Sequence, residues 1–287
     1  MQIGVVYPQT ELSPDTQTLR TYAARAEELG FRHLLTYDHV LGADPAVHRD
    51  WRGPYDLSTT FHEPLVMFGF LAAVTKLELV TGIIIAPQRQ TALLAKQAAE
   101  VDILSEGRFR LGIGIGWNAV EYEALGQDFR TRGRREEEQI GLMRRLWTEQ
   151  SVTHEGDFDR VTGAGLAPPP VQRPIPVWLG GSSPAAYRRI GKLADGWFPQ
   201  VVPGPQLDEA SAIVELAAQD AGRDPSTLGM EGRISWTGDP ADIVKHSGRW
   251  GDAGATHLSV NTMGAGLEGL DAHLDALAHT AEALSLT

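Results

Sequence analysis

The chain has 287 residues, a formal charge of −12 with histidines neutral, and no cysteine. An acidic excess of this size argues against nucleic acid or an anionic membrane as the main partner, because both are bound by a basic face. Without cysteine the chain has no disulfide, no thiolate zinc site and no cysteine nucleophile.

Short apolar runs that predict β-strands recur along the whole chain. The first begins almost at the N-terminus, with no signal-peptide pattern before it. No apolar stretch reaches the roughly 20 residues that a membrane-spanning helix needs, so we expect a soluble, cytoplasmic protein. In chain order the candidate strands cover residues 3–7, 33–37, 77–86, 109–114, 176–179, 196–198, 230–236 and 256–260.

Amphipathic helices are predicted between the strands. One covers residues 15–29 and ends before Gly30. Another follows Gly238, with Asp239 as its N-cap and Pro240 in the first helical position. The last has apolar residues at spacings of three and four, which give it a single apolar face formed by Leu267, Leu270, Leu274, Leu277, Ala281 and Leu284.

The alternation of strands and helices predicts a parallel sheet, and the number of strands favours its closure into a single (β/α)8 TIM barrel. We expect one domain over residues 1–287, because no change in composition marks another; an open doubly wound sheet is the main alternative. Two insertions are predicted, residues 39–62 after strand 2 and residues 131–173 before strand 5. The second begins with a charged helix at 132–147. Such long segments usually form lids or binding elements.

Polar and aromatic residues gather at the predicted carboxyl ends of the strands. In a barrel these ends share one face, and that face carries the active site. The set contains little charge and suits a flat aromatic ligand better than a metal ion or a sugar. Its members are Asp38, His39, Ala86, Pro87, Gln88, Arg89, Gly116, Trp117, Asn118, Gly180, Gly181, Ser182, Ser183, Trp197, Gln200, Trp236 and Asn261.

An acid and an imidazole, Asp38 and His39, end the second predicted strand. Together they could bind the edge of a ring and exchange a proton near neutral pH. The alternative is that the pair only holds the following loop in place. Both interpretations stay open from sequence.

A phosphate-binding loop is predicted where the fifth strand meets the next helix. Gly180 and Gly181 have no side chain to cover the backbone, and Ser182 follows them. Ser183 and Pro184 then supply an N-cap and a first-turn proline. Free N–H groups and the positive end of a helix dipole form an anion site. A simple tight turn is the alternative, because glycine and serine are common in turns.

A second glycine-rich stretch, residues 112–119, contains G-x-G-x-x-A between a strand and a helix. This is the dinucleotide fingerprint of open α/β sheets, which normally requires an acid closing the next strand. A charged helix occupies that region here, so we favour a close approach of the backbone to a ligand ring.

Other common chemistries lack their motifs. The chain has no H-E-x-x-H, and its nine histidines show no paired ligand spacing, so no metal site is expected. It also has no G-x-S-x-G, which leaves serine-hydrolase chemistry without its nucleophile elbow.

Taken in order, several of these stretches resemble the bacterial luciferase-like monooxygenase superfamily, in particular its F420-dependent oxidoreductase branch. The resemblance covers most of residues 3–199 and is specific as a set. The stretches that carry it are Glu28-Leu29-Gly30-Phe31, Thr36-Tyr37-Asp38-His39, Thr81-Gly82-Ile83, Leu104-Ser105-Glu106-Gly107-Arg108-Phe109, Gly112 through Glu121-Tyr122, Pro176 through Gly181, and Ala194-Asp195-Gly196-Trp197.

The resemblance implies a barrel that binds the deazaflavin coenzyme F420, or alternatively FMN. It implies that His39 is the catalytic acid or base, or stabilises charge as the hydride moves, and that Asp38 contacts the ring edge. It further implies a non-prolyl cis peptide at Gly82-Ile83 that supports the ring. The remaining residues implied to bind the cofactor are Gly116, Trp117 and Asn118, the phosphate-holding Gly180, Gly181, Ser182 and Ser183, and Trp197.

One departure from the family pattern concerns Trp117. Sugar-phosphate dehydrogenases of the F420 branch carry a glutamate directly after the glycine corresponding to Gly116, so the resemblance does not extend to their substrate class. Glu121, one helical turn further on, could substitute for that acid, although ordinary helix polarity explains it equally well.

The predicted function is hydride transfer between coenzyme F420 and a small organic substrate. An FMN-dependent monooxygenase is the first alternative, and a cofactor-free barrel lyase or hydrolase and a non-catalytic flavin-binding protein are the others. The resemblance also implies a homodimer, formed through the early helices. The substrate itself depends on the long loop 41–60 and on residues 131–173, whose shapes the sequence does not give.

Overall fold

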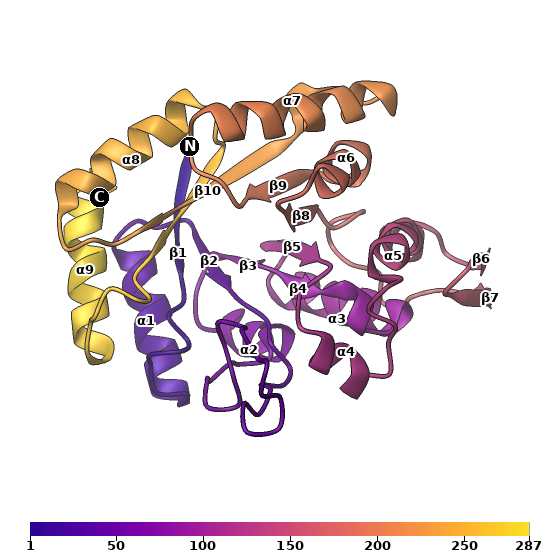
Figure 1. Cartoon of the computed structure of the whole chain (residues 1–287), viewed down its shortest axis with the longest axis horizontal. Coiled ribbons are helices and arrows are strands. Elements are labelled where there is room, and N and C mark those ends of the chain that lie inside the picture. The colour runs from indigo at the N-terminus through magenta and orange to yellow at the C-terminus, as the bar shows by residue number, and fades with distance from the viewer. Residues whose placement is uncertain (287) are drawn as a thin grey trace.

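The computed structural model describes residues 1–286, which form a closed barrel of parallel strands surrounded by helices (Figure 1). Neighbours follow the order β3-β2-β1-β11-β10-β9-β8-β5, and a pairing between β3 and β5 closes the ring. The (β/α)8 barrel is therefore confirmed and the open sheet is wrong. The strands are β1 (Gln2–Val6), β2 (His33–Thr36), β3 (Glu78–Thr81), β4 (Ile84–Ile85), β5 (Phe109–Gly114), β8 (Val177–Gly181), β9 (Gly196–Pro199), β10 (Gly229–Ser235) and β11 (His257–Asn261).

The predicted strand at 77–86 is present as two pieces, β3 and β4. Residues Gly82 and Ile83 separate them, and both pieces pair with β5, at Leu79 with Phe109 and at Ile84 with Ile113. The two pieces therefore occupy one strand position of the barrel, with an irregularity between them. A glycine inside a predicted strand is typical of such an irregularity.

Helices follow the strands and pack around the barrel (Figure 1). The cap residues agree with the sequence pattern: Asp239 accepts a hydrogen bond from the Ala241 N–H, and Asp15 accepts one from the Thr18 N–H. The helices are α1 (Thr16–Glu28), α2 (Pro64–Leu71), α3 (Thr91–Leu104), α4 (Ala119–Ala124), α5 (Arg132–Thr148), α6 (Pro184–Leu193), α7 (Pro205–Asp220), α8 (Pro240–Asp252) and α9 (Gly269–Ala283), with 3-10 turns η1 (Ala86–Gln88) and η2 (Pro225–Thr227).

The insertion before the fifth barrel strand is smaller than predicted. Its charged helix, α5, packs against α3 and α6 and so fills the place of the barrel's fourth outer helix. The true insertion is an antiparallel hairpin of β6 (Val152–Glu155) and β7 (Arg160–Ala164), with the Pro-rich stretch after it. The Glu138 carboxylate of α5 stabilises the hairpin turn by accepting hydrogen bonds from the N–H groups of Asp157 and Asp159.

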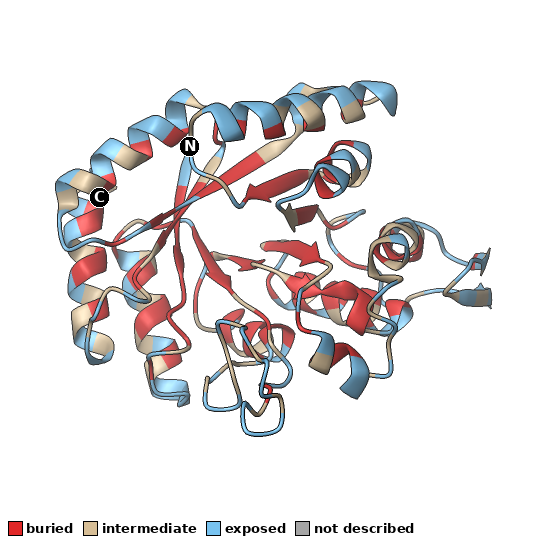
Figure 2. Cartoon of the chain, in the orientation of Figure 1, coloured by how far each residue is buried: buried red, intermediate tan, exposed pale blue. Residues whose placement is uncertain are grey.

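Buried residues lie on the barrel strands and on the inner faces of the helices, as the red ribbon of Figure 2 shows, and the apolar ones form a core of two parts. The larger part lies between the barrel and the helices. The smaller part fills the barrel itself and is formed by Val6, Leu35, Val80, Trp178 and Phe198. On α9 the buried stripe includes His273 and Thr280, so the predicted leucine face is rotated and Leu270 and Leu274 are only half-buried.

A charged network crosses the barrel interior near the amino ends of the strands. Arg110 of β5 donates to Glu231 of β10 and to Glu78 of β3. Glu231 also accepts hydrogen bonds from His33 and Ser259. Burial raises the pKa of Glu231, but Arg110 and His33 outweigh it, so the pKa lies below its usual range. The network was not predicted from sequence.

No helix within residues 1–286 combines the length and the apolar character needed to cross a bilayer.

Because Glu136 of α5 is buried, we expect the protein to lose stability at high pH. Burial raises the pKa of Glu136 from 4.5 to about 8, despite Arg189 Nη1 at 3.4 Å. Between these values the folded chain keeps a proton that the unfolded chain has released, so stability falls as pH rises. Glu136→Gln removes this loss, and we expect it to be more stable than wild type by about 4–5 kcal/mol at about pH 9, but by less than about 1 kcal/mol at about pH 5.

Urea unfolding of both proteins at the two pH values measures the difference. Glu137→Gln is the matched control, because Glu137 lies beside Glu136, also pairs with Arg189 and is only half-buried. If the free energies of unfolding of wild type and Glu136→Gln change by the same amount between the two pH values, the prediction is contradicted.

Candidate functional site

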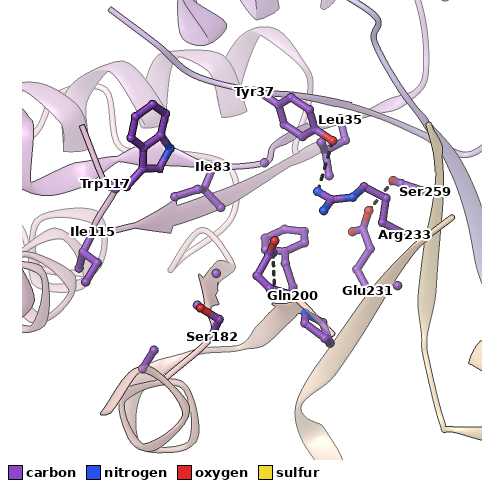
Figure 3. A pocket seen from close by; sticks show the side chains of 18 of the residues that line it. Leu35, Tyr37, Ile83, Ile115, Trp117, Ser182, Gln200, Glu231, Arg233 and Ser259 are labelled. Atoms are coloured by element: carbon purple, nitrogen blue, oxygen red, sulfur yellow. Dashed lines mark hydrogen bonds between the residues drawn. The ribbon is translucent and has the colours of Figure 1, made fainter. Parts of the chain in front are cut away.

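Two adjoining cavities open at the carboxyl ends of the barrel strands. The first, shown in Figure 3, has a volume of about 350 Å³. The second has a volume of about 630 Å³. They meet along a shared wall formed by Tyr37, Gly82, Ile83, Gly116, Trp117, Gln200 and Arg233.

The shared wall contains the irregularity between β3 and β4. The peptide bond between Gly82 and Ile83 is cis, in agreement with what the resemblance implied. The Ile83 side chain lies at the boundary of both cavities, and Leu35 adds apolar surface to the first (Figure 3). Phe198 also lines the first cavity. The first cavity therefore has an apolar wall suited to the face of a planar ring.

The glycine-serine loop lies on the first cavity, at the start of α6. Gly180 and Gly181 end β8, and all four residues of the loop line the cavity. Ser183 is the N-cap, since its hydroxyl accepts a hydrogen bond from the Ala186 N–H at 3.2 Å. Ser182 is exposed to the cavity. A helix N-terminus thus faces a hollow, as an anion site requires.

Gly116 and Trp117 lie at the cavities, whereas Asn118 does not. Gly116 has a positive φ of 61°, which favours glycine, and Trp117 is 42% exposed. The Asn118 side chain caps α4 by accepting from the Val120 N–H and lines neither of the two cavities, so its contact with the cofactor stays a prediction. The dinucleotide-fold interpretation of this stretch is also wrong, because its strand belongs to a closed barrel.

The Asp38 carboxylate lines the second cavity but is already bound. Its two oxygens accept from the Arg89 guanidinium at 2.8 and 2.9 Å, and one also accepts from the Ile85 N–H. These bonds tie Asp38 to the segment around β4 and η1 and not to the loop that follows it, and its contact with the ring edge stays a prediction.

The His39 ring lies in the second cavity with one nitrogen held. Its Nδ1 is 3.2 Å from Oε1 of Glu121. A carboxylate only accepts hydrogen bonds, so Nδ1 carries a proton. The Nε2 atom has no hydrogen-bond partner within residues 1–286. The ring packs edge-on against Tyr55, Phe61 and Trp117, with centroids 4.8 to 5.5 Å apart.

Glu121 is more than a polar residue on a helix surface. Its side chain is 1% exposed, and it accepts the N–H groups of Val40 at 2.8 Å and Leu41 at 3.1 Å as well as the bond from His39. Burial raises the pKa of Glu121, but the hydrogen bonds from His39 and Leu41 outweigh it, so the pKa is below its usual range. Glu121 is therefore a charged positioning group behind His39.

Trp197 is not at the cavities, which corrects its predicted role. Its side chain belongs to the outer core and packs against Tyr187 of α6, with ring centroids 5.9 Å apart. The next residue, Phe198, belongs to the barrel interior and lines the first cavity. Successive residues of a strand point to opposite faces, so only one of the two can face inward.

Charged residues of β10 were missed. Glu231 and Arg233 line the first cavity, and Arg233 and Ser235 line the second, so the predicted lack of charge is wrong. A signal was available: these polar residues alternate with Gly232 and Ile234, and a period of two indicates one polar strand face. Tyr37, which the sequence placed only at a strand end, faces Arg233 (Figure 3).

Within residues 1–286 no group of three or more histidine, aspartate or glutamate side chains is placed to hold a metal ion.

Comparisons with known proteins place these features in context. The model of the luciferase-like monooxygenase family matches residues 1–269. An F420-dependent glucose-6-phosphate dehydrogenase of Intrasporangium calvum is 31% identical over 80% of this chain and 68% of its own length. An FMNH(2)-dependent dimethylsulfone monooxygenase of Pseudomonas fluorescens is 33% identical over 62% of this chain and 46% of its own.

A solved structure, an F420-dependent secondary alcohol dehydrogenase in complex with an F420-acetone adduct, aligns with a TM-score of 0.79. The alignment covers 99% of this chain and 98% of that one at 19% identity, so it shows the shared fold alone.

Proposed function

The chain belongs to the luciferase-like monooxygenase family, and on that basis we propose that it is an oxidoreductase that transfers a hydride between coenzyme F420 and a small organic substrate. The F420-dependent relative matches 80% of this chain and the FMN-dependent one 62%, which favours the deazaflavin. The proposal includes one barrel domain over residues 1–287 and a homodimer. The observation that carries it is the phosphate-type loop and His39 converging on adjoining cavities.

The residues present fit such a cofactor. The first cavity offers an apolar wall, with Leu35, Ile83 and Phe198, for a planar ring. At its edge the start of α6 offers Gly181 and Ser182 to a phosphate, through N–H groups, a hydroxyl and the helix dipole. The loop brings no cationic side chain, so the backbone supplies the attraction.

The protein's own contribution would be orientation and proton handling. A bound deazaflavin supplies hydride donor or acceptor chemistry and does not activate oxygen. Glu121 keeps the proton on Nδ1 of His39, so Nε2 is the atom that would take or give a proton at the substrate. Trp117, Tyr55 and Phe61 enclose the imidazole and limit the access of water to it.

FMN-dependent monooxygenation is the second candidate, supported by the similarity to the Pseudomonas fluorescens enzyme. Fluorescence titration of the purified protein with each cofactor separates the two, because Trp117 lies at the proposed ring site. Quenching at low concentrations of F420 but not of FMN is expected, and Trp117→Phe should reduce the signal. Tight FMN binding without F420 binding would reverse the assignment.

The Ser182 site predicts a charge-specific effect on cofactor binding. Ser182→Asp places a carboxylate where the phosphate would lie, and we expect it to weaken F420 binding by about tenfold or more, through repulsion of two negative charges in contact. Ser182→Asn is the control of matched shape and should bind F420 like wild type. Dissociation constants from fluorescence titration measure the effect.

The same titration with the phosphate-free deazaflavin is the second control, because the carboxylate has no charge to repel there. An equal weakening of both ligands, or of both variants, would place the phosphate elsewhere.

A further inference from the structure

Arg233 is a cationic side chain in the mouth of the barrel that has no acidic partner among residues 1–286. It comes from β10 and lines both cavities. Within residues 1–286 its one hydrogen bond runs from Nη1 to the Tyr37 hydroxyl at 3.3 Å (Figure 3). By contrast, Arg89 at the same mouth is paired with Asp38.

The carboxylates around the second cavity are all engaged by other groups. Asp38 and Glu121 are held as described above. Glu11 accepts a hydrogen bond from the Gly264 N–H at 2.7 Å and lies 3.4 Å from Nε2 of His273. Among the described residues, Arg233 is therefore the charged side chain on this cavity whose hydrogen-bonding groups are still largely free.

Further donors point to the same kind of ligand. The Tyr37 oxygen accepts from Arg233, which leaves its own O–H free to donate. Asn261 also lines the second cavity, and its Oδ1 accepts from the Met263 N–H, which leaves the amide hydrogens of Nδ2. The cavity thus presents a guanidinium, a phenol and an amide as donors, while its acidic acceptors are occupied.

We propose that the second cavity binds a substrate bearing an anionic group of the carboxylate type, held by Arg233 and Tyr37, with its apolar part against Trp117 and Tyr55. This rests on the proposed function and names its substrate class. A guanidinium fork matches a carboxylate in shape and charge. The Ser182 loop lines the first cavity and not the second, whereas Arg233 and Tyr37 lie on the wall that the two cavities share.

Binding of probe anions tests the proposal without turnover. The probes are 4-fluorobenzoate and the neutral 4-fluorobenzyl alcohol, followed by fluorine NMR titration with and without F420. We expect wild type to prefer the anion by about tenfold or more, the usual contribution of one charge-assisted hydrogen bond. Arg233→Gln should lose this preference, and Arg233→Lys should keep part of it. The control is Arg160→Gln, a change of the same type on the exposed hairpin.

Equal anion preference in wild type and Arg233→Gln would overturn the proposal. Folding of each variant is checked by its thermal unfolding curve, and Arg233→Lys provides a second variant that retains the charge. A second titration, of F420 against the phosphate-free deazaflavin, identifies the source of the anion. If Arg233→Gln loses that discrimination instead, Arg233 serves the cofactor phosphate and the proposal is wrong. Failure of wild type to bind F420 would refute the proposed function and leave the benzoate result interpretable.

Discussion

Replacing His39 with alanine is expected to lower turnover by about 10²–10⁴-fold, the usual contribution of a positioned acid or base. The reason is that His39 brings a ring nitrogen without a partner to the second cavity, backed by a buried carboxylate. F420 affinity should stay close to that of wild type, because His39 does not line the first cavity. Turnover is followed as the change in deazaflavin absorbance with a panel of small alcohols and hydroxy acids.

Two further variants sharpen this result. Glu121→Gln keeps the shape that holds Val40 and Leu41 but removes the charge behind His39, so an intermediate loss of turnover is expected. His246→Ala, on α8, removes a histidine that lines neither cavity and should have no effect. Unchanged turnover in His39→Ala would remove His39 from proton handling, whereas absence of turnover in the wild type would favour a non-catalytic binding protein.

Arg110→Ala is expected to destabilise the fold by about 3–5 kcal/mol, the usual cost of breaking a buried ion pair by removing one partner. Arg110 is 2% exposed, and its loss leaves Glu231 without its main counter-charge inside the barrel. It also removes the guanidinium that lies over the Trp178 ring at 4.2 Å. The free energy of unfolding in urea measures the effect.

Matched variants separate the buried charge from the loss of side-chain volume. Arg110→Met combined with Glu231→Met leaves no unpaired carboxylate on β10 and should recover part of the loss. Arg25→Ala removes an exposed pair with Glu28 and should cost about 0.5 kcal/mol or less. If Arg110→Ala costs no more than Arg25→Ala, the network does not stabilise the barrel.

The charged network around Glu231 is also expected to make stability fall at low pH. The pKa of Glu231 is lower in the folded chain than its ordinary 4.5, so its contribution is present above that value and is lost as pH falls. Glu231→Gln should therefore flatten the acid branch of the stability curve.

Much of the barrel could be predicted from local patterns. Each strand candidate corresponds to an observed strand or pair of strands, because buried parallel strands are apolar runs bounded by glycine, proline and caps. Which face of each strand points into the barrel was harder to predict from the sequence. Residues 196–199 are buried along their whole length, so no alternation distinguishes Trp197 from Phe198.

The site was predicted only where a single segment carries it. The glycine-serine loop and the Gly82-Ile83 irregularity are each formed by a few consecutive residues, and both line the first cavity. The partners of Asp38 and His39 were different. Arg89 lies 51 residues from Asp38, and Glu121 lies 82 residues from His39. No local pattern relates residues so far apart.

The sequence by itself determined the order of strands and helices, their caps and the glycine-rich strand ends, because these depend on spacings of two to four residues. Only the tertiary structure decided which charges meet. Closing the ring brings Arg110 of β5 to Glu231 of β10, two strands that are not neighbours in the sheet, and leaves Arg233 against Tyr37. Coulomb energy and desolvation depend on distances through space, and those distances exist only once the barrel is closed.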